Sequence, residues 1–307
     1  MSQRQTRRHF LQDAAASSAG LAAGLCSTSF VGRALAIEPV ARNDKPKYKL
    51  SLAAYSYRDL LTGGSPALTL DDFIAECARM QLDGTELTSY YFPTEVTDDY
   101  LRHLKQLSFR LGLDVSGTAV GNDFCHPTGP ERDKQIAGVK SWIDHADVLG
   151  APVIRIFSGG QRDGQSESEA RQLAVEGIAQ CCEYAGQHGV FLALENHGGL
   201  TATPEGLLSL VQAVDSPWFG VNLDTGNFHG ADIYAELAQL APYALNVQVK
   251  VMVQPAGQER QATDFARLRS LLDNAKYRGY IVLEFEEAED PRDACPRYVE
   301  ELRKAFA

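Results

Sequence analysis

Eight short apolar segments alternate with eight longer amphipathic segments from Lys49 onward, and this alternation limits the fold more than any other feature of the sequence. Each apolar segment has the length of a buried strand, and each segment after it repeats its apolar residues at helical spacing. The predicted strands cover residues 50–54, 84–87, 114–118, 153–157, 190–195, 219–223, 244–251 and 280–285. The predicted helices cover residues 70–81, 97–111, 130–149, 167–188, 204–213, 231–240, 262–275 and 292–306.

The ends of these predicted helices carry residues that favour helix ends. Gly150 and Gly189 follow two helices, and Thr203-Pro204 precedes another as an N-cap with proline in the first turn. Eight βα units in about 260 residues predict a single-domain α/β protein with the (β/α)8 TIM barrel fold. An open doubly wound sheet is the alternative, but no G-x-G-x-x-G motif follows the first predicted strand.

The first 36 residues have the pattern of an export signal. A weakly apolar run of Ala, Gly and Ser covers 14–30, and small residues three apart favour cleavage after Ala36. The run is shorter than the ~20 residues of a membrane span. An ordinary basic amphipathic start is the alternative. The segment resembles a twin-arginine signal peptide, and the matching residues are Arg7, Arg8, Phe10 and Leu11.

This interpretation divides the chain into three parts. Residues 1–36 form the twin-arginine signal peptide, 37–47 a short linker, and 48–307 the barrel. The mature protein is then expected to be periplasmic or secreted, with no membrane attachment after signal cleavage. The twin-arginine route exports proteins that are already folded, which suits a protein that loads a metal ion or cofactor before export.

Charge and cysteine content exclude several classes of function. The net charge is −11, and it becomes −14 without residues 1–36. An acidic surface repels nucleic acid and anionic membranes, whereas a neutral sugar or a cation is compatible with it. Five cysteines remain after cleavage, with no C-x-x-C pair, so we expect buried thiols and neither a zinc–cysteine site nor a disulfide framework.

Polar residues lie at or near the ends of four consecutive predicted strands, where barrel enzymes build their sites. These residues are Glu195, Asp224, Gln248 and Glu284, separated by 29, 24 and 36 residues. Carboxylates on apolar strands repel one another unless a cation lies between them. Three carboxylates and an amide oxygen favour Mn²⁺ or Mg²⁺, with Co²⁺ as an alternative. The other interpretation is that each acid caps a helix or pairs with a base.

These residues lie within motifs that resemble the sugar phosphate isomerase/epimerase family with the xylose isomerase-like barrel. The resemblance spans about residues 48–307, and its motifs are Glu195-Asn-His197, Leu223-Asp224-Thr-Gly-Asn227, Gln248-Val-Lys250 and Leu283-Glu284. It implies that Glu195 and Glu284 bind a divalent metal and also exchange the substrate proton. It implies that Asp224 is a further ligand. The strand-seven ligand of the family is usually histidine, so Gln248 departs from the pattern.

Two further residues, one at the end of a predicted strand and one within a strand, are candidates for substrate binding. Glu86 ends the second predicted strand, followed by Tyr90 and Tyr91. It can bind a substrate hydroxyl or belong to a structural network at the barrel mouth, and the two rings can form a wall for a sugar. Arg155 lies among apolar residues of the fourth strand, so we expect it to hold Glu86 or Glu195, or to contact the substrate.

The remaining candidates lie near the proposed ligands. His197 and Lys250 each follow a predicted ligand by two residues, on the same side of the strand, and can act as acid or electrostatic partner. Asn227 belongs to a matched motif, and His126 follows the third strand. The barrel also resembles apurinic endonucleases, but their multi-zinc site needs several histidines at strand ends, and the acidic charge disfavours a nuclease.

A metal between two sugar oxygens would acidify the neighbouring carbon and stabilise an enediolate. Return of the proton to the other face gives an epimer, and return to the next carbon gives an isomer. Loss of a β leaving group gives a lyase, such as one that cleaves 3-keto-glycosides. We therefore expect an isomerase/epimerase for a small sugar, with a lyase acting on an oxidised glycoside or a non-catalytic sugar-binding barrel as alternatives. A homo-oligomer is compatible with the sequence.

Replacement of both paired arginines, Arg7→Lys with Arg8→Lys, should leave the precursor in the cytoplasm, because a receptor reads the pair as an export address. Cell fractionation followed by immunoblotting measures this. Processed protein of the double mutant in the periplasm would contradict the twin-arginine interpretation.

Overall fold

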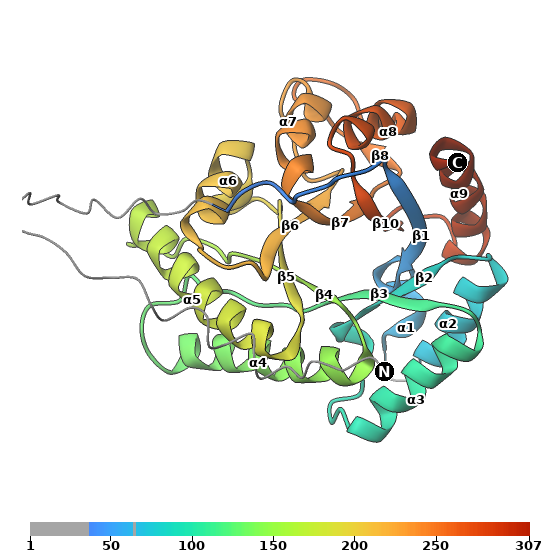
Figure 1. Ribbon diagram of the computed structural model, residues 1–307, viewed down its shortest axis with the longest axis horizontal. Coiled ribbons are helices and arrows are strands. Elements are labelled where there is room, and N and C mark those ends of the chain that lie inside the picture. The colour runs from blue at the N-terminus through green and yellow to red at the C-terminus, as the bar shows by residue number, and fades with distance from the viewer. Residues whose placement is uncertain (1–36, 64–65) are drawn as a thin grey trace, which may run out of the picture. The chain divides into compact units, whose positions relative to one another are not determined.

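Eight parallel strands close into a barrel in the computed structural model, which describes residues 37–63 and 66–307 (Figure 1). Around the barrel the order is β1-β10-β7-β6-β5-β4-β3-β2, and β1 pairs with both β10 and β2. The prediction of a (β/α)8 TIM barrel is confirmed. The strands are β1 (Lys47–Ala53), β2 (Gly84–Thr88), β3 (Asp114–Ala119), β4 (Val153–Ile156), β5 (Phe191–Glu195), β6 (Phe219–Asp224), β7 (Ala244–Val249) and β10 (Arg278–Leu283).

A major helix follows each barrel strand and packs on the outside of the barrel (Figure 1). The hydroxyl oxygen of Thr203 accepts a hydrogen bond from the N–H of Gly206 at 3.1 Å. It thereby caps the helix that begins at Pro204, as the sequence predicts. Gly150 and Gly189 end two others with positive φ angles of 81° and 69°. The helices are α2 (Leu70–Arg79), α3 (Asp98–Arg110), α4 (Pro130–Leu149), α5 (Glu167–His188), α6 (Pro204–Ala213), α7 (Ile233–Leu240), α8 (Phe265–Asn274) and α9 (Pro291–Phe306).

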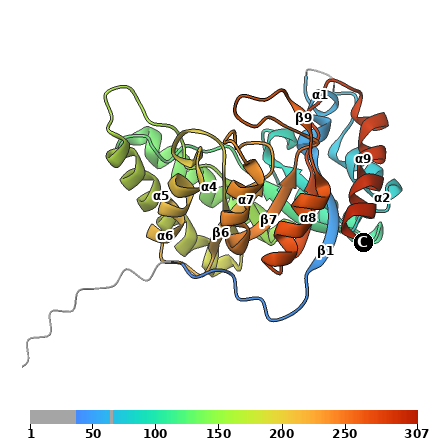
Figure 2. The ribbon, with the colours of Figure 1, turned by 90° about the horizontal axis from the view of Figure 1, so that it is seen from above.

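Short elements that the sequence pattern does not predict lie at the carboxyl end of the barrel strands. They are the single turn α1 (Arg58–Leu61) and a hairpin of two-residue strands, β8 (Met252–Val253) and β9 (Gln261–Ala262). Figure 2 shows α1 and β9 at the same end of the molecule. Strands of two residues are too short to show a periodicity in the sequence. The sequence therefore predicts one strand over residues 244–251, whereas β7 ends at Val249.

The predicted linker, residues 37–47, lies along the amino-terminal end of the barrel (Figure 2). The Val40 N–H donates to the Pro242 carbonyl at 3.0 Å. The Arg42 guanidinium donates to four carbonyls at 2.5–3.4 Å, those of Ala241, Pro242, Ala244 and Ala275. The predicted signal peptide, residues 1–36, lies outside the described residues.

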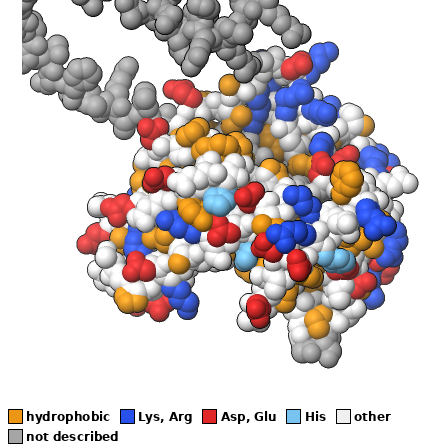
Figure 3. Space-filling model, turned by 60° about the horizontal axis from the view of Figure 1, so that its bottom comes forward, with side chains coloured by type: hydrophobic (Ala, Val, Ile, Leu, Met, Phe, Trp, Pro, Cys, Tyr) orange, Lys and Arg blue, Asp and Glu red, His pale blue; other side chains and the backbone are white. Residues whose placement is uncertain are grey.

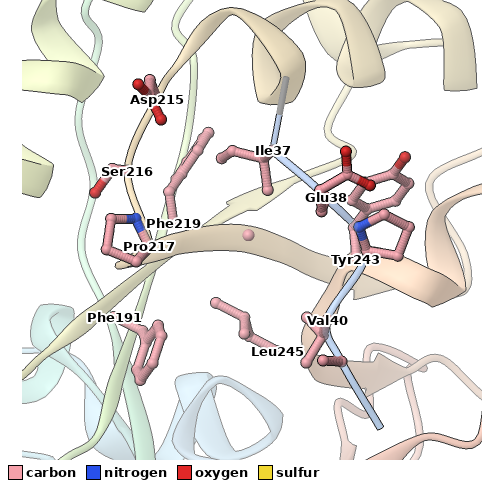
Figure 4. A pocket seen from close by; sticks show the side chains of 13 residues that line it. Ile37, Glu38, Val40, Phe191, Asp215, Ser216, Pro217, Phe219, Tyr243 and Leu245 are labelled. Atoms are coloured by element: carbon pink, nitrogen blue, oxygen red, sulfur yellow. The ribbon is translucent and has the colours of Figure 1, made fainter. Parts of the chain in front are cut away.

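This segment covers a cavity of about 500 Å³ at the closed end of the barrel (Figure 4). Ile37 and Val40 face Phe191 and Phe219, which are the first residues of β5 and β6. The largely apolar cavity therefore lies at the opposite end of these strands from the predicted site, and it belongs to the packing of the segment.

The inward-facing side chains of the strands include a buried polar network in the middle of the barrel. Gln248 donates from Nε2 to Glu86 Oε1 at 2.7 Å, and Asn246 donates to Glu86 Oε2 at 2.9 Å. Asn222 donates in turn to Gln248 Oε1 at 2.6 Å. Burial raises the pKa of Glu86 to about 7, and the negative charge of Glu284 adds to the effect. Both polar atoms of Gln248 are thus used inside the barrel.

The outward-facing side chains of the same strands form the apolar core with the helices. Leu192, Leu223 and Val247 are fully buried there. The five described thiols are free and buried, as the sequence predicts, and they are Cys77, Cys125, Cys181, Cys182 and Cys295. Strand alternation therefore separates an apolar layer outside the barrel from a polar interior.

Glu86→Ala should lower the free energy of unfolding by about 2–4 kcal/mol, because two buried amides lose their acceptor. Urea denaturation measures the loss. Glu95→Ala, at an exposed glutamate outside the network, is the matched control and should change stability by less than about 0.5 kcal/mol. Equal stability of the two variants would show that the network does not depend on Glu86.

Candidate active site

Four charged side chains meet where β5, β6, β7 and β10 end. Glu195 and Asp224 are the last residues of β5 and β6, while Lys250 and Glu284 directly follow β7 and β10. All four are buried, with exposures of at most 8%. Buried charges are costly unless they are paired, so their mutual contacts determine how this end of the barrel is organised.

Lys250 lies at the centre of this group. Its Nζ lies 3.3 Å from Asp224 Oδ2 and 2.9 Å from Glu286 Oε1, and it contacts Glu284 Oε2. Burial alone would lower the pKa of Lys250, but Asp224 and Glu284 raise it well above its usual value. Burial would raise the pKa of Glu284, but the ammonium beside it lowers that pKa below its usual range.

Arg155 holds the other glutamate. Its Nε lies 2.9 Å from Glu195 Oε2, and its guanidinium lies 4.1 Å from the centroid of the Phe157 ring. Asn227 donates to Glu195 Oε1 at 3.0 Å, so both oxygens of this carboxyl have partners. Burial raises the pKa of Glu195 well above its usual value despite the guanidinium. Burial also raises the pKa of Asp224 to about 7.

The two glutamates therefore differ in their preferred charge. Lys250 lowers the pKa of Glu284 and burial raises that of Glu195, so Glu195 takes up a proton more readily than Glu284 does. A carboxylate can accept a proton and a carboxylic acid can donate one, and two acids whose environments separate their pKa values can divide these roles. The arrangement is suited to moving a proton between two positions on a bound molecule.

Three of the four predicted metal ligands, Glu195, Asp224 and Glu284, lie together, but the fourth, Gln248, does not join them. Gln248 binds Glu86 and Asn222 inside the barrel, and Lys250 contacts the carboxylates of Asp224 and Glu284. Within residues 37–63 and 66–307, no three His, Cys, Asp or Glu side chains form a group that could hold a metal ion. These side chains do not fit a divalent ion, because a lysine two residues after Gln248 extends into the space between the carboxylates.

Two cavities lie at the mouth, and one of them reaches the charged group at Lys250. One of about 170 Å³ is lined by Lys250, Asn227, His229, Arg260 and Glu286, among others. Another, of about 440 Å³, is also lined by Asn227 and His229. A molecule bound here would meet Lys250, which contacts Glu284, and Asn227, which binds Glu195. The volume of the larger cavity suits a small polar molecule.

The other predicted substrate-binding residues lie in different places. His197 lines the larger cavity, with its ring centroid 4.6 Å from that of Phe157, and burial lowers its pKa. Glu86 lies in the barrel network, where both oxygens have partners. His126 contacts Arg162 at 2.7 Å, in a cluster formed by the loops after β3 and β4.

The sequence pattern does not identify Glu286 or Arg260 as site residues, and His229, although it follows the sixth predicted strand, is not among the predicted substrate contacts. Glu286 follows Glu284 by two residues, and strand alternation could have indicated that both face the mouth. Arg260 reaches the cavity from the hairpin, where it pairs with Glu287 at 2.6 and 2.7 Å. No pattern in the sequence indicates that position, because the hairpin itself is too short to predict.

The visible surface carries charges of both signs. Figure 3 shows Lys and Arg side chains interspersed with Asp and Glu side chains over most of one face, with histidines among them. In the part of the chain that the structure describes, no helix is both long and apolar enough to cross a membrane.

Comparison with known proteins agrees with this fold. The chain is 28% identical over 213 residues to 3-dehydroshikimate dehydratase of Bacillus anthracis. The aligned region covers 66% of this chain and 71% of that protein. D-psicose 3-epimerase of Clostridium cellulolyticum H10 superposes with a TM-score of 0.71 at 14% identity, covering 84% of this chain and 99% of the epimerase. The probable 3-DHS dehydratase AsbF of Bacillus anthracis superposes with a TM-score of 0.62 at 20% identity, covering 83% and 98%.

The family assignment rests on most of the barrel. Residues 74–305 match the family described as xylose isomerase-like TIM barrel, from the second helix to the last. This match agrees with the closed parallel barrel and with the resemblance found in the strand-end motifs. The chain belongs to the xylose isomerase-like TIM barrel family.

Proposed function

We propose that this protein is a sugar isomerase/epimerase that moves a proton at a carbon next to a carbonyl group. The observation that carries the proposal is the pair Glu195 and Glu284, each held by a cation at the barrel mouth. Family membership supports the same class, since an epimerase shares the fold. The cavities beside the pair support a small sugar as substrate.

The proposed reaction uses the two glutamates in sequence. Ionised Glu284 takes the proton from the carbon, and the electron pair of the broken C–H bond moves to the carbonyl oxygen as an enolate. Lys250 and Arg155 are buried beside the glutamates and offset this negative charge. Glu195 returns a proton to the opposite face of the carbon for epimerisation. For isomerisation, the hydroxyl proton of that carbon first moves to the enolate oxygen, and Glu195 then protonates the former carbonyl carbon. The glutamates exchange their protons with water before the next turnover.

The proposal also covers the source of positive charge at the site and the place where the enzyme acts. The resemblance implies a divalent ion, most readily Mn²⁺, in related epimerases, whereas in this chain Lys250 and Arg155 supply positive charge beside the carboxylates. Export through the twin-arginine route would place the enzyme in the periplasm or outside the cell, where it would meet free or oxidised sugars.

A lyase is the second candidate, because the sequence relative in Bacillus anthracis is a dehydratase. The same enolate would expel a leaving group at the β carbon, and only one glutamate would be needed as a base. Release of water or an alcohol from the substrate, as from a 3-keto-glycoside, distinguishes this reaction from isomerisation. A non-catalytic sugar-binding barrel would bind the sugar without exchanging any carbon-bound proton.

Glu195→Gln and Glu284→Gln should each lower kcat by about 10²–10⁴-fold, because each removes one proton-transfer group. Proton NMR in D₂O, with a panel of free sugars and 3-keto-glycosides, measures both turnover and deuterium incorporation. In an epimerase, each variant should still exchange the proton of one epimer more readily than it interconverts the two.

Glu183→Gln is the matched control and should keep wild-type turnover, since this glutamate is exposed near the end of α5, just before β5 begins at the opposite end of the barrel from the mouth. Near-wild-type turnover by both site variants would show that the two-glutamate reaction is wrong. A strong effect of only one of them, together with release of a leaving group, would favour the lyase.

A further inference from the structure

We propose that Lys250 is the resident cation of this site and takes the position that a divalent ion would need to bind the carboxylates. The inference rests on the proposed function for its catalytic meaning, but its structural part stands on contacts alone. Lys250 Nζ contacts carboxylates on two neighbouring strand ends, Asp224 at 3.3 Å and Glu284 in closer contact. An ion shared by these two carboxylates would have to displace the ammonium group.

The neighbouring backbone leaves room for the lysine side chain. A Cβ atom added at Gly226 would lie 2.5 Å from Lys250 Cγ and 2.9 Å from Lys250 Cβ, closer than such atoms can approach. The Gly226 N–H donates to Asp224 Oδ1 at 2.8 Å, which leaves the other oxygen toward the ammonium. A glycine at this position therefore permits the lysine to lie across the strand ends.

The backbone of Lys250 is fixed on both sides. Its N–H donates to Thr225 Oγ1 at 2.9 Å, and its carbonyl accepts the hydroxyl of Thr263 at 2.6 Å. The residue two positions earlier, Gln248, has both polar atoms bound within the barrel, so its oxygen has a partner already. The lysine is thus a positioned part of the site, and the fourth predicted ligand is turned away from it.

An ammonium group limits how a substrate can bind. It has three N–H donors and offers a hydrogen bond to one oxygen at a time, whereas a divalent ion can bind two neighbouring oxygens together. Its contacts with Asp224 and Glu284 are buried, while Glu286, 2.9 Å away, has a side chain that is 35% exposed and lines the cavity. We infer that the carbonyl oxygen of the substrate replaces Glu286 at Lys250 Nζ.

Titration with Mn²⁺ tests the inference without any substrate. The full chain is freed of metal with a chelator, and unbound Mn²⁺ is measured by its EPR signal. The wild type should take up no Mn²⁺ at this site. Lys250→Met should take up one ion per chain at Mn²⁺ concentrations about tenfold below those at which the wild type still shows no uptake. Mn²⁺ should also raise the Tm of this variant only, because it would bind the folded state.

Two further variants complete the comparison. Lys250→Arg keeps a cation and should behave like the wild type, and Lys134→Met removes an exposed lysine as the matched control. Uptake of one Mn²⁺ by the wild type, lost in Asp224→Asn, would overturn the inference. Folded Lys250→Met without uptake would also overturn it. If Lys250→Met does not fold, the titrations of wild type and Lys250→Arg decide, since uptake by either contradicts the inference.

The result of the Mn²⁺ titration can be judged independently of the proposed function. If no sugar incorporates deuterium at carbon, the proposed reaction is wrong, but the Mn²⁺ result still holds. Exchange that persists in a chelator-treated wild type would support both. Exchange that is lost on chelation and restored by Mn²⁺ would keep the proposed function and overturn the role of Lys250.

Discussion

The pairing of buried carboxylates with buried cations is the constraint on which the mouth of this barrel depends. Three acids, Glu195, Asp224 and Glu284, lie at the ends of apolar strands, where unpaired charges would cost far more than the fold can offset. Arg155 and Lys250 provide the compensation, each from a strand that belongs to the same barrel. Positive charge supplied by the chain is therefore part of the folded structure, present before any ligand binds.

The polar network beneath the mouth has a different role. Glu86, Asn222, Asn246 and Gln248 join β2, β6 and β7 across the barrel interior, and their hydrogen bonds satisfy one another. Such a network fixes the register of side chains in the layer above it, because a slipped strand would leave buried amides without partners. A polar layer inside the barrel thus supports the site, whereas the helices pack against the outside of the barrel through apolar contacts.

Most of the fold could be predicted from the sequence, and the orientation of individual polar side chains could not. The eight barrel strands and the major helices follow from periodicity, and helix ends follow from Thr203, Gly150 and Gly189. Position at a strand end correctly brought Glu195, Asp224 and Glu284 together. Whether Gln248 or Lys250 faces the carboxylates depends on competing partners, Glu86 below and Glu286 above, which lie far away in sequence. Spacing alone contains no information on that competition.

The segment at the amino-terminal end of the barrel has a consequence for how the two ends of the strands divide their tasks. Ile37 lines the cavity at that end, and Arg42 binds four carbonyls there, while the charged group lies at the carboxyl ends of the strands. The contacts of residues 37–42 thus tie the start of the described chain to the barrel without touching the charged group. Altered packing of this segment would therefore change the stability of the barrel and leave the chemistry of the mouth as it is.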